Sequence, residues 1–213
     1  MVVFHAARDL EFLQVLPPGT TLSGGWSIFA RCVAGSFFFF AGISLVLAHA
    51  GGIRWLGFWH RLAMVGAAAL LVSAVTYAAM PSRFIYFGIL HSIAICSLIG
   101  LVFVPLPASV TLLAAAGVLG LHLGDVHPLS LPIWSPTGLS NIVRPTLDLL
   151  PIVPWLSPLL IGIFVAKVWQ PVPGRSTTLL TWLGWPGRHS LWIYLLHQPI
   201  LIGVMWLLLR WLS

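Results

Sequence analysis

The chain has 213 residues, of which 59% are hydrophobic and only 7% are charged. A soluble domain carries about 25% charged residues and could not hide this much apolar surface at this size, which excludes a water-soluble fold. The formal charge of +6 reflects ten basic residues against four acidic ones. Because the basic residues are scattered and mostly adjoin apolar runs, they indicate membrane topology and an anionic ligand rather than nucleic-acid binding.

Uninterrupted apolar runs of about 20 residues indicate transmembrane helices, because a helix needs that length to cross a bilayer. A membrane barrel would instead show alternating segments of roughly 10 residues, and the sequence has none. Residues 1–7 are apolar but too short to span, and a charged, proline-containing loop follows them to residue 25. We interpret residues 1–7 as the end of a first helix whose opening turns are encoded upstream of Met1. Full spans are expected at 26–50, 62–80, 84–104, 108–124, 149–168 and 191–212.

The predicted fold is an all-α integral membrane protein, a polytopic helical bundle of six full transmembrane helices plus a truncated first helix, in one domain over residues 1–213. Two connections are long. Residues 125–148 are rich in proline, serine, glycine and tryptophan, and loops of this length are often functional. Residues 169–190 are expected to hold a short helix at 178–183. Two prolines, Pro151 and Pro154, predict an irregular first turn for the fifth span.

The orientation follows from lysine and arginine, which are enriched in cytoplasmic loops. If residues 1–7 end outside, the inner loops hold five such residues, namely Arg54, Arg61, Lys167, Arg175 and Arg188. The outer segments then hold four, namely Arg8, Arg83, Arg144 and Arg210. This bias favours the orientation in which residues 1–7 end outside.

Ionisable residues in or near membrane spans are costly, which makes them functional candidates. In this orientation the outer side holds His5, Asp9, Arg83, His91 and Asp148. A histidine titrates near neutral pH and a carboxylate can orient it, so this group has the ingredients of general acid–base catalysis. His5 and Asp9 are spaced i, i+4 and share one face if the segment is helical.

Each outer residue also has a structural explanation. In the structural interpretation, His5 and Asp9 form a surface pair at a helix end. His91 would then bond a backbone carbonyl, and Asp148 would cap a helix or pair with Arg144. On the inner side, the cationic residues suit a phosphate or pyrophosphate group, whereas simple anchoring by snorkelling would also explain them. Four further histidines are interpreted as interfacial residues, namely His49, His60, His122 and His189. Cys32 and Cys96 lie within apolar runs, and no metal site follows from them.

Five segments, in order, carry a resemblance to a known family. They are MVVFHAARDL at 1–10, FFFFAGISLVL at 37–47, RFIYFGILHSIA at 83–94, LDLLPIVPWLSPLLIG at 147–162 and GWPGRHSLWIYLLHQPIL at 184–201. Together they resemble the bacterial relatives of heparan-α-glucosaminide N-acetyltransferase, a family long catalogued as a domain of unknown function. The chain lacks the acidic residue and Arg-Gly pair with which the family's first helix opens.

The resemblance implies acyl transfer across a bacterial cytoplasmic membrane. The donor would be cytoplasmic acyl-CoA, acetyl-CoA above all, and the acceptor a sugar-like hydroxyl or amine at the outer face. The implied catalytic residues are His5, Asp9, His91 and Asp148, with His5 or His91 as the base. The implied substrate-binding residues are Arg83, Trp155, His197 and Gln198, and the implied donor-binding residues are Arg61 and Arg188. The human-type enzyme uses a histidine after its first helix, and residues 7–47 contain none.

Two other functions fit the same polar residues. A small-molecule transporter or permease would use them as a substrate or proton pathway, although no convincing internal repeat relates the two halves. A non-catalytic membrane subunit would use them only to hold helices together. Loss of turnover with intact folding, after replacement of His5 or His91, would separate the enzyme from the subunit. A homodimer is left open, and no metal is expected.

Overall fold

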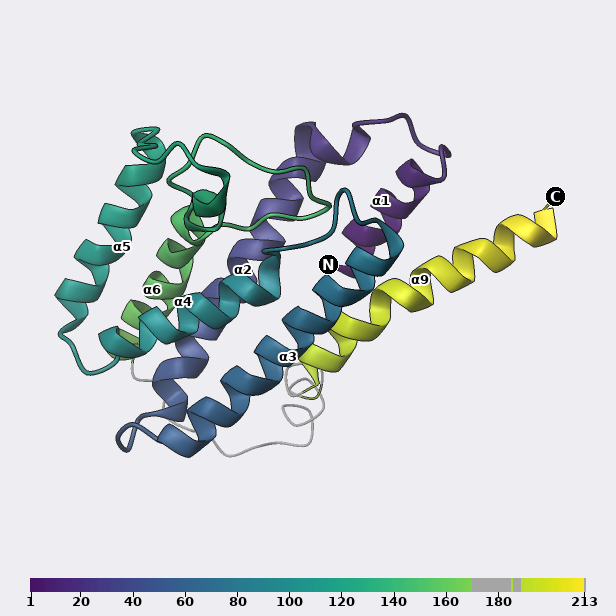
Figure 1. The fold of residues 1–213 in the computed structure, drawn as a ribbon. Coiled ribbons are helices and arrows are strands. Elements are labelled where there is room, and N and C mark those ends of the chain that lie inside the picture. The colour runs from purple at the N-terminus through teal and green to yellow at the C-terminus, as the bar shows by residue number, and fades with distance from the viewer. Residues whose placement is uncertain (170–184, 186–188, 213) are drawn as a thin grey trace. The chain divides into compact units, whose positions relative to one another are not determined.

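The computed structural model describes residues 1–169, 185 and 189–212 (Figure 1). The short helix expected at 178–183 and the basic residues Arg175 and Arg188 lie outside the described residues. Seven α-helices and two short 3-10 helices are described, namely α1 (Val2–Phe12), η1 (Thr20–Leu22), α2 (Gly24–Ala48), α3 (Trp55–Ala79), α4 (Ile89–Phe103), α5 (Ala108–Leu123), η2 (Pro132–Thr137), α6 (Ile152–Trp169) and α9 (Ser190–Leu212).

Four of the described helices are long and apolar enough to cross a membrane, namely α2, α3, α6 and α9. The apolar helices α4 and α5 are shorter, with 15 and 16 residues. An all-helical protein with several membrane-spanning candidates is therefore confirmed, whereas six full spans are not. Large apolar side chains such as Leu56 and Leu70 on α3 are exposed, as expected for surfaces that face lipid.

The described residues fall into two compact units. The first unit comprises 1–33 together with 172–213, and thus holds α1, η1, the start of α2 and α9. The second unit comprises 34–171, and holds the rest of α2 together with α3 to α6.

The core of the second unit lies where α2 and α6 cross. Gly42 on α2 and Gly162 on α6 face the backbone of the opposite helix, so that a Cβ on Gly42 would collide with the carbonyl oxygen of Leu159 and a Cβ on Gly162 with that of Phe39. Small residues at such a crossing let two backbones approach closely, which is how membrane helices gain packing energy.

Lys167, near the end of α6, joins α6 to the α4–α5 turn. Its ammonium group donates hydrogen bonds to the carbonyl oxygens of Phe103 and Leu106 and to the hydroxyl of Thr111, the last at 3.1 Å. The two carbonyls lie at the end of α4 and just beyond it, where backbone acceptors lack intrahelical partners. This cation is therefore used within the protein, although the sequence counted it among the cations available to an anionic ligand.

Two helix starts differ from the sequence prediction. Helix α4 begins at Ile89 rather than at residue 84, because residues 83–88 run beside 146–150 instead of coiling. The backbone N–H of Leu147 donates to the Arg83 carbonyl at 2.8 Å, and Phe87 and Leu149 form a parallel bridge. Helix α3 begins at Trp55, seven residues before the predicted start, and no proline interrupts the chain between the Gly51–Gly52 pair and Pro81.

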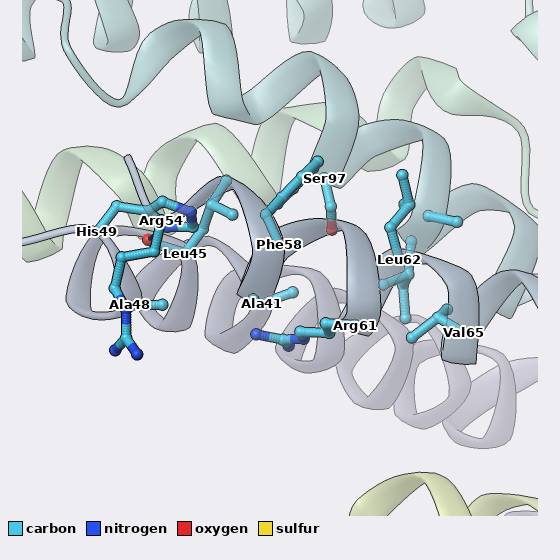
Figure 2. Close-up of a pocket in the computed structure, with 13 residues that line it drawn as sticks. Ala41, Leu45, Ala48, His49, Arg54, Phe58, Arg61, Leu62, Val65 and Ser97 are labelled. Carbon is cyan, nitrogen blue, oxygen red and sulfur yellow. Dashed lines mark hydrogen bonds between the residues drawn. The ribbon is translucent and has the colours of Figure 1, made fainter. Parts of the chain in front are cut away.

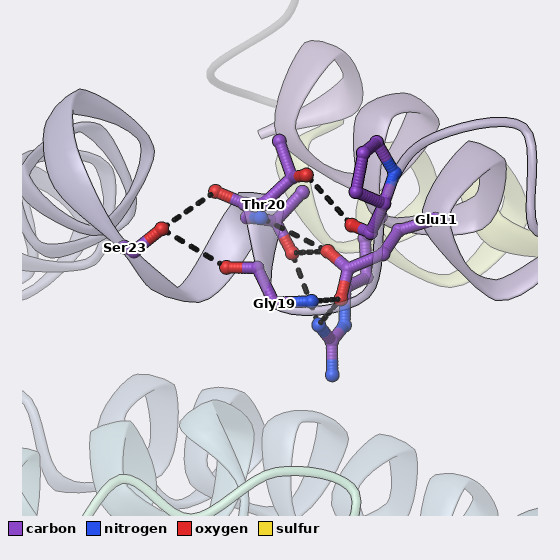
Figure 3. Close-up of polar contacts among 7 residues, drawn as sticks. Glu11, Gly19, Thr20 and Ser23 are labelled. Carbon is purple, nitrogen blue, oxygen red and sulfur yellow. Dashed lines mark hydrogen bonds and ion pairs between the residues drawn. The ribbon is translucent and has the colours of Figure 1, made fainter.

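In the first unit, Glu11 ties the end of α1 to η1 (Figure 3). Its carboxylate accepts hydrogen bonds from the backbone N–H groups of Gly19 (2.7 Å) and Thr21 (2.9 Å), from the Thr21 hydroxyl, and from Arg8 at 3.0 Å. These bonds, the Thr21 hydroxyl first, hold the pKa of Glu11 down at about 2.

Replacement of Glu11 with glutamine is expected to lower the Tm at neutral pH, because an amide cannot accept the four bonds in the same way. A carboxylate whose pKa is depressed stabilises the fold fully above its unfolded value of 4.5 and loses that contribution as the pH falls towards about 2. The Tm gap between wild type and Glu11→Gln should therefore narrow on acidification. Thermal unfolding followed by tryptophan fluorescence checks this, and a gap independent of pH would contradict it.

Candidate functional site

Polar side chains of α1 and α9 form a cluster in the first unit, which we call the α1–α9 cluster. It consists of His5 and Asp9 from α1 with His197 and Gln198 from α9. Helix α1 continues to Phe12, five residues beyond the predicted end of the first helix at residue 7, so His5 and Asp9 lie on one face. The Gln198 amide donates a hydrogen bond to Asp9 Oδ1 at 2.8 Å, and the rings of His5 and His197 lie 4.8 Å apart between centroids. The structure thus brings together four of the predicted site residues from opposite ends of the chain.

The tautomer of His197 follows from its hydrogen bond. Its Nδ1 lies 2.6 Å from the carbonyl oxygen of Tyr194, and because a carbonyl only accepts, Nδ1 carries the proton. The other nitrogen, Nε2, then holds a lone pair in the neutral ring. The ring is buried, and Nε2 has no hydrogen-bond partner among the described residues. An imidazole held in this way is arranged as a proton acceptor.

Two more buried atoms of the α1–α9 cluster lack partners within the described part of the chain, Asp9 Oδ2 and Gln198 Oε1. Buried polar atoms are almost always hydrogen-bonded, so three unpartnered atoms in one cluster need an explanation. All three are acceptors when Asp9 is ionised and His197 is neutral. Such a set favours a ligand that donates several hydrogen bonds, as a polyol or an amine does, and disfavours an anion.

A second group lies in the second unit at the start of α4. The backbone N–H of Ile89 donates to Asp148 Oδ2 at 3.3 Å, so Asp148 caps this helix. Only glycine fits at position 88, because a Cβ there would lie 2.8 Å from the same oxygen. The structural explanation of Asp148 as a cap is therefore confirmed, although the capped helix is α4 and not the span that follows Asp148. Desolvation raises the pKa of Asp148 to about 6, against the two backbone hydrogen bonds that lower it.

The raised pKa of Asp148 predicts a specific pH dependence of stability. The folded state binds the proton more tightly than the unfolded state, whose value is 3.8, so stability falls as the pH rises from about 4 to above about 6. The loss is on the order of 3 kcal/mol. Asp148→Asn should remove this decline and keep the cap, whereas Asp125→Asn, at an exposed carboxylate, should retain it. Tm values across this pH range check the prediction, and parallel profiles for wild type and Asp148→Asn would contradict it.

Three other predicted site residues lie in the second unit, namely His91, Arg83 and Trp155. The structure shows no acid–base pair formed by any of them among the described residues. His91 Nε2 is 3.3 Å from the Ser73 hydroxyl, which itself donates to the Ile85 carbonyl at 2.6 Å, so the ring N–H donates to the hydroxyl. The side chain of Arg83 is exposed. Trp155 stacks on Phe38 with centroids 5.6 Å apart, within the core. The roles predicted for these residues remain predictions.

Arg61 lies two turns into α3 and lines a cavity of about 200 Å³ together with residues of α2 and α4 (Figure 2). His49 lines the same cavity. Sequence reasoning placed His49 among interfacial histidines, yet the ring is buried. No spacing in the sequence could have revealed this, since burial depends on Phe58 of the next helix, whose ring meets that of His49 edge-on. The other predicted donor-binding residue, Arg188, is outside the described residues.

Comparison with known proteins bears on both sites. The family model described as heparan-alpha-glucosaminide N-acetyltransferase, catalytic, matches residues 1–199. The chain belongs to this family. The match confirms the resemblance to this N-acetyltransferase family, and it includes both halves of the α1–α9 cluster as well as the Arg61 cavity. Membership in the N-acetyltransferase family supports membrane-bound acyltransferase activity. No curated protein and no solved structure matches the chain.

Proposed function

We propose that the protein is a membrane acetyltransferase that moves an acetyl group from acetyl-CoA to a hydroxyl or amine of a saccharide-like acceptor. Family membership supports the reaction class. The observation that supports the acceptor class is the α1–α9 cluster, whose three buried and unpartnered acceptor atoms match the donors of a polyol or amino sugar. A cluster of acceptors cannot bind the phosphates of the acetyl donor, so the acceptor substrate is the better occupant.

In the proposed reaction, His197 Nε2 takes the proton of the acceptor hydroxyl or amine as its oxygen or nitrogen attacks the thioester carbonyl carbon. The new C–O or C–N bond joins the acetyl group to the acceptor. The C–S bond of the thioester breaks, and CoA leaves as the thiolate. The proton on His197 passes to the thiolate, which regenerates the neutral imidazole and releases CoA as the thiol. Asp9 Oδ2 and Gln198 Oε1 hold further hydroxyls of the acceptor. His5, whose ring lies beside His197, positions it.

The distribution of basic residues supports transfer from the inner to the outer face, which is the direction we propose. Cytoplasmic acetyl-CoA would bind at the inner face through Arg61 and Arg188, and the acceptor would lie at the outer face of a bacterial cytoplasmic membrane. His91 and Asp148 would then serve the fold at the start of α4 more than the proton transfer, since Asp148 caps α4 and His91 bonds Ser73.

Release of CoA thiol from acetyl-CoA, with and without acceptors, tests the proposed function in the detergent-purified protein. We expect thiol release that depends on an amino sugar or polyol and saturates with both substrates. The same protein in proteoliposomes should show no uptake of labelled sugar in the absence of acetyl-CoA. Sugar uptake without acetyl-CoA, and no thiol release with any acceptor, would establish the transporter and overturn the enzyme.

A further inference from the structure

The cavity beside Arg61 lies entirely in the second unit and combines a buried histidine with two arginines (Figure 2). Its walls come from the end of α2, the first turns of α3 and the middle of α4, and most of the lining side chains are small or apolar. Its volume of about 200 Å³ is below that of a pocket for a complete cofactor-sized ligand, which is typically about 300–1,000 Å³. The cavity thus suits one polar group of a larger molecule. We call it the Arg54–Arg61 pocket.

His49 lines this pocket and has one ring nitrogen without a hydrogen-bond partner among the described residues. The residue follows the last residue of α2, and its Nδ1 lies 2.7 Å from the Leu45 carbonyl, so Nδ1 carries the proton. The ring is only 6% exposed and meets Phe58 edge-on, which fixes its orientation. The remaining nitrogen, Nε2, is buried without a hydrogen-bond partner among the described residues. A buried lone pair in this position needs a ligand that donates a hydrogen bond.

Arg54 and Arg61 supply positive charge to the same pocket. They are spaced i, i+7, so they lie on one face of the helix start, and Figure 2 shows both side chains extending to the same side of the pocket. Within the described part of the chain, neither forms an ion pair with a carboxylate. The chain has only four acidic residues, and none of them lines this pocket. Two unneutralised guanidinium groups above a small cavity are arranged for an anion with several oxygens.

We propose that the Arg54–Arg61 pocket binds the phosphate or pyrophosphate group of a ligand that also carries a hydroxyl or amide N–H. The guanidinium groups of Arg54 and Arg61 take the phosphate oxygens, and His49 Nε2 accepts the hydrogen bond from the neighbouring N–H or hydroxyl. One source of such a ligand is the nucleotide end of the acetyl donor, and here the inference rests on the proposed function. The other source is a phospholipid headgroup, and both sources share the same chemistry.

The test measures binding by the full chain in non-ionic detergent, with inorganic pyrophosphate and CoA as the probes. Arg54→Gln and Arg61→Gln should each weaken pyrophosphate and CoA binding about tenfold or more, because each removes a charge-assisted hydrogen bond. His49→Phe should weaken CoA binding more than pyrophosphate binding, since pyrophosphate lacks the amide N–H and ribose hydroxyl groups that CoA can offer to His49. Arg144→Gln and His60→Gln are the matched controls and should bind as wild type does. Tm values and the charge-preserving Arg61→Lys separate lost binding from lost folding.

Lipid binding distinguishes the two sources. Native mass spectrometry measures how much phospholipid remains bound to wild type, Arg54→Gln and Arg61→Gln. The same measurement after addition of CoA shows whether CoA displaces the lipid from wild type. Displacement assigns the pocket to the donor, and retention against CoA assigns it to a headgroup. Unchanged affinity for pyrophosphate, CoA and phospholipid in both arginine variants would show that the Arg54–Arg61 pocket does not bind phosphate. That result would not affect the proposed acetyltransferase function. A wild type that binds phosphate there but never transfers acetyl would overturn the proposed function alone.

Discussion

Replacement of His197 with alanine is expected to lower acetyl transfer by about 100-fold or more while the protein stays folded. The reason is that proton transfer by a positioned side chain contributes about 10²- to 10⁴-fold, and His197 is held with its proton on Nδ1 and its lone pair on a buried Nε2. Thiol release under saturating substrates measures the loss. The defect should lie in kcat rather than in the KM for acetyl-CoA, because the cluster contains no group suited to phosphate.

Matched variants make this result specific. His122→Ala removes an exposed histidine near the end of α5 and should leave turnover unchanged. Asp9→Asn keeps the acceptor for Gln198 but removes the negative charge, so it should raise the KM for the acceptor more than it lowers kcat. Equal activity of wild type and His197→Ala, at equal Tm, would show that His197 does not carry the proton. The base would then be sought at His5 or His91.

Replacement of Gly162 with leucine is expected to prevent the second unit from folding as described. Its Cβ would collide with the Phe39 carbonyl, and the reciprocal collision at Gly42 involves the Leu159 carbonyl, so neither helix can yield without moving the other. Overpacking in a core costs about 1–3 kcal/mol when side chains can shift, and a clash with backbone should exceed that range. We expect a large drop in Tm and loss of the monodisperse peak in size-exclusion chromatography.

Glycine replacements elsewhere provide the comparison. Gly117 on α5 has no atom within 4 Å of the position a Cβ would take, and Gly117→Leu should fold as wild type does. Gly162→Ala should lie between the two, since its single methyl group already meets the Phe39 carbonyl. Equal Tm values for Gly162→Leu and Gly117→Leu would mean that the crossing of α2 and α6 is not as close as described.

Much of the fold was predictable from the long apolar runs. In lipid, a helix satisfies the backbone hydrogen bonds of such a run internally. The position of each helix start was less predictable. Residues 83–88 read as part of an apolar run, but their backbone bonds to 146–150, which the sequence places more than fifty residues away. Arg61 similarly moved from a predicted loop into α3, since no local signal marks where that helix begins. Long-range backbone pairing overrides local hydropathy at such points.

The candidate site was predictable in its residues and less so in its pairings. His5 and Asp9 were singled out because polar side chains are rare in an apolar chain and therefore conspicuous, whereas His197 and Gln198 came from the family resemblance. The predicted topology grouped His5 and Asp9 with other outer residues and gave no contact between them and the last helix. The hydrogen bond between Gln198 and Asp9 joins residues 189 positions apart, and no spacing rule reaches that far.

Mass spectrometry of an amino sugar, incubated with the purified protein and isotopically labelled acetyl-CoA, reports directly whether acetyl transfer takes place. We expect labelled acetyl on the amine or a hydroxyl of the sugar, formed by wild type and His122→Ala and strongly reduced in His197→Ala. If folded wild type labels none of a broad set of amino sugars and polyols, the protein is not the proposed acetyltransferase.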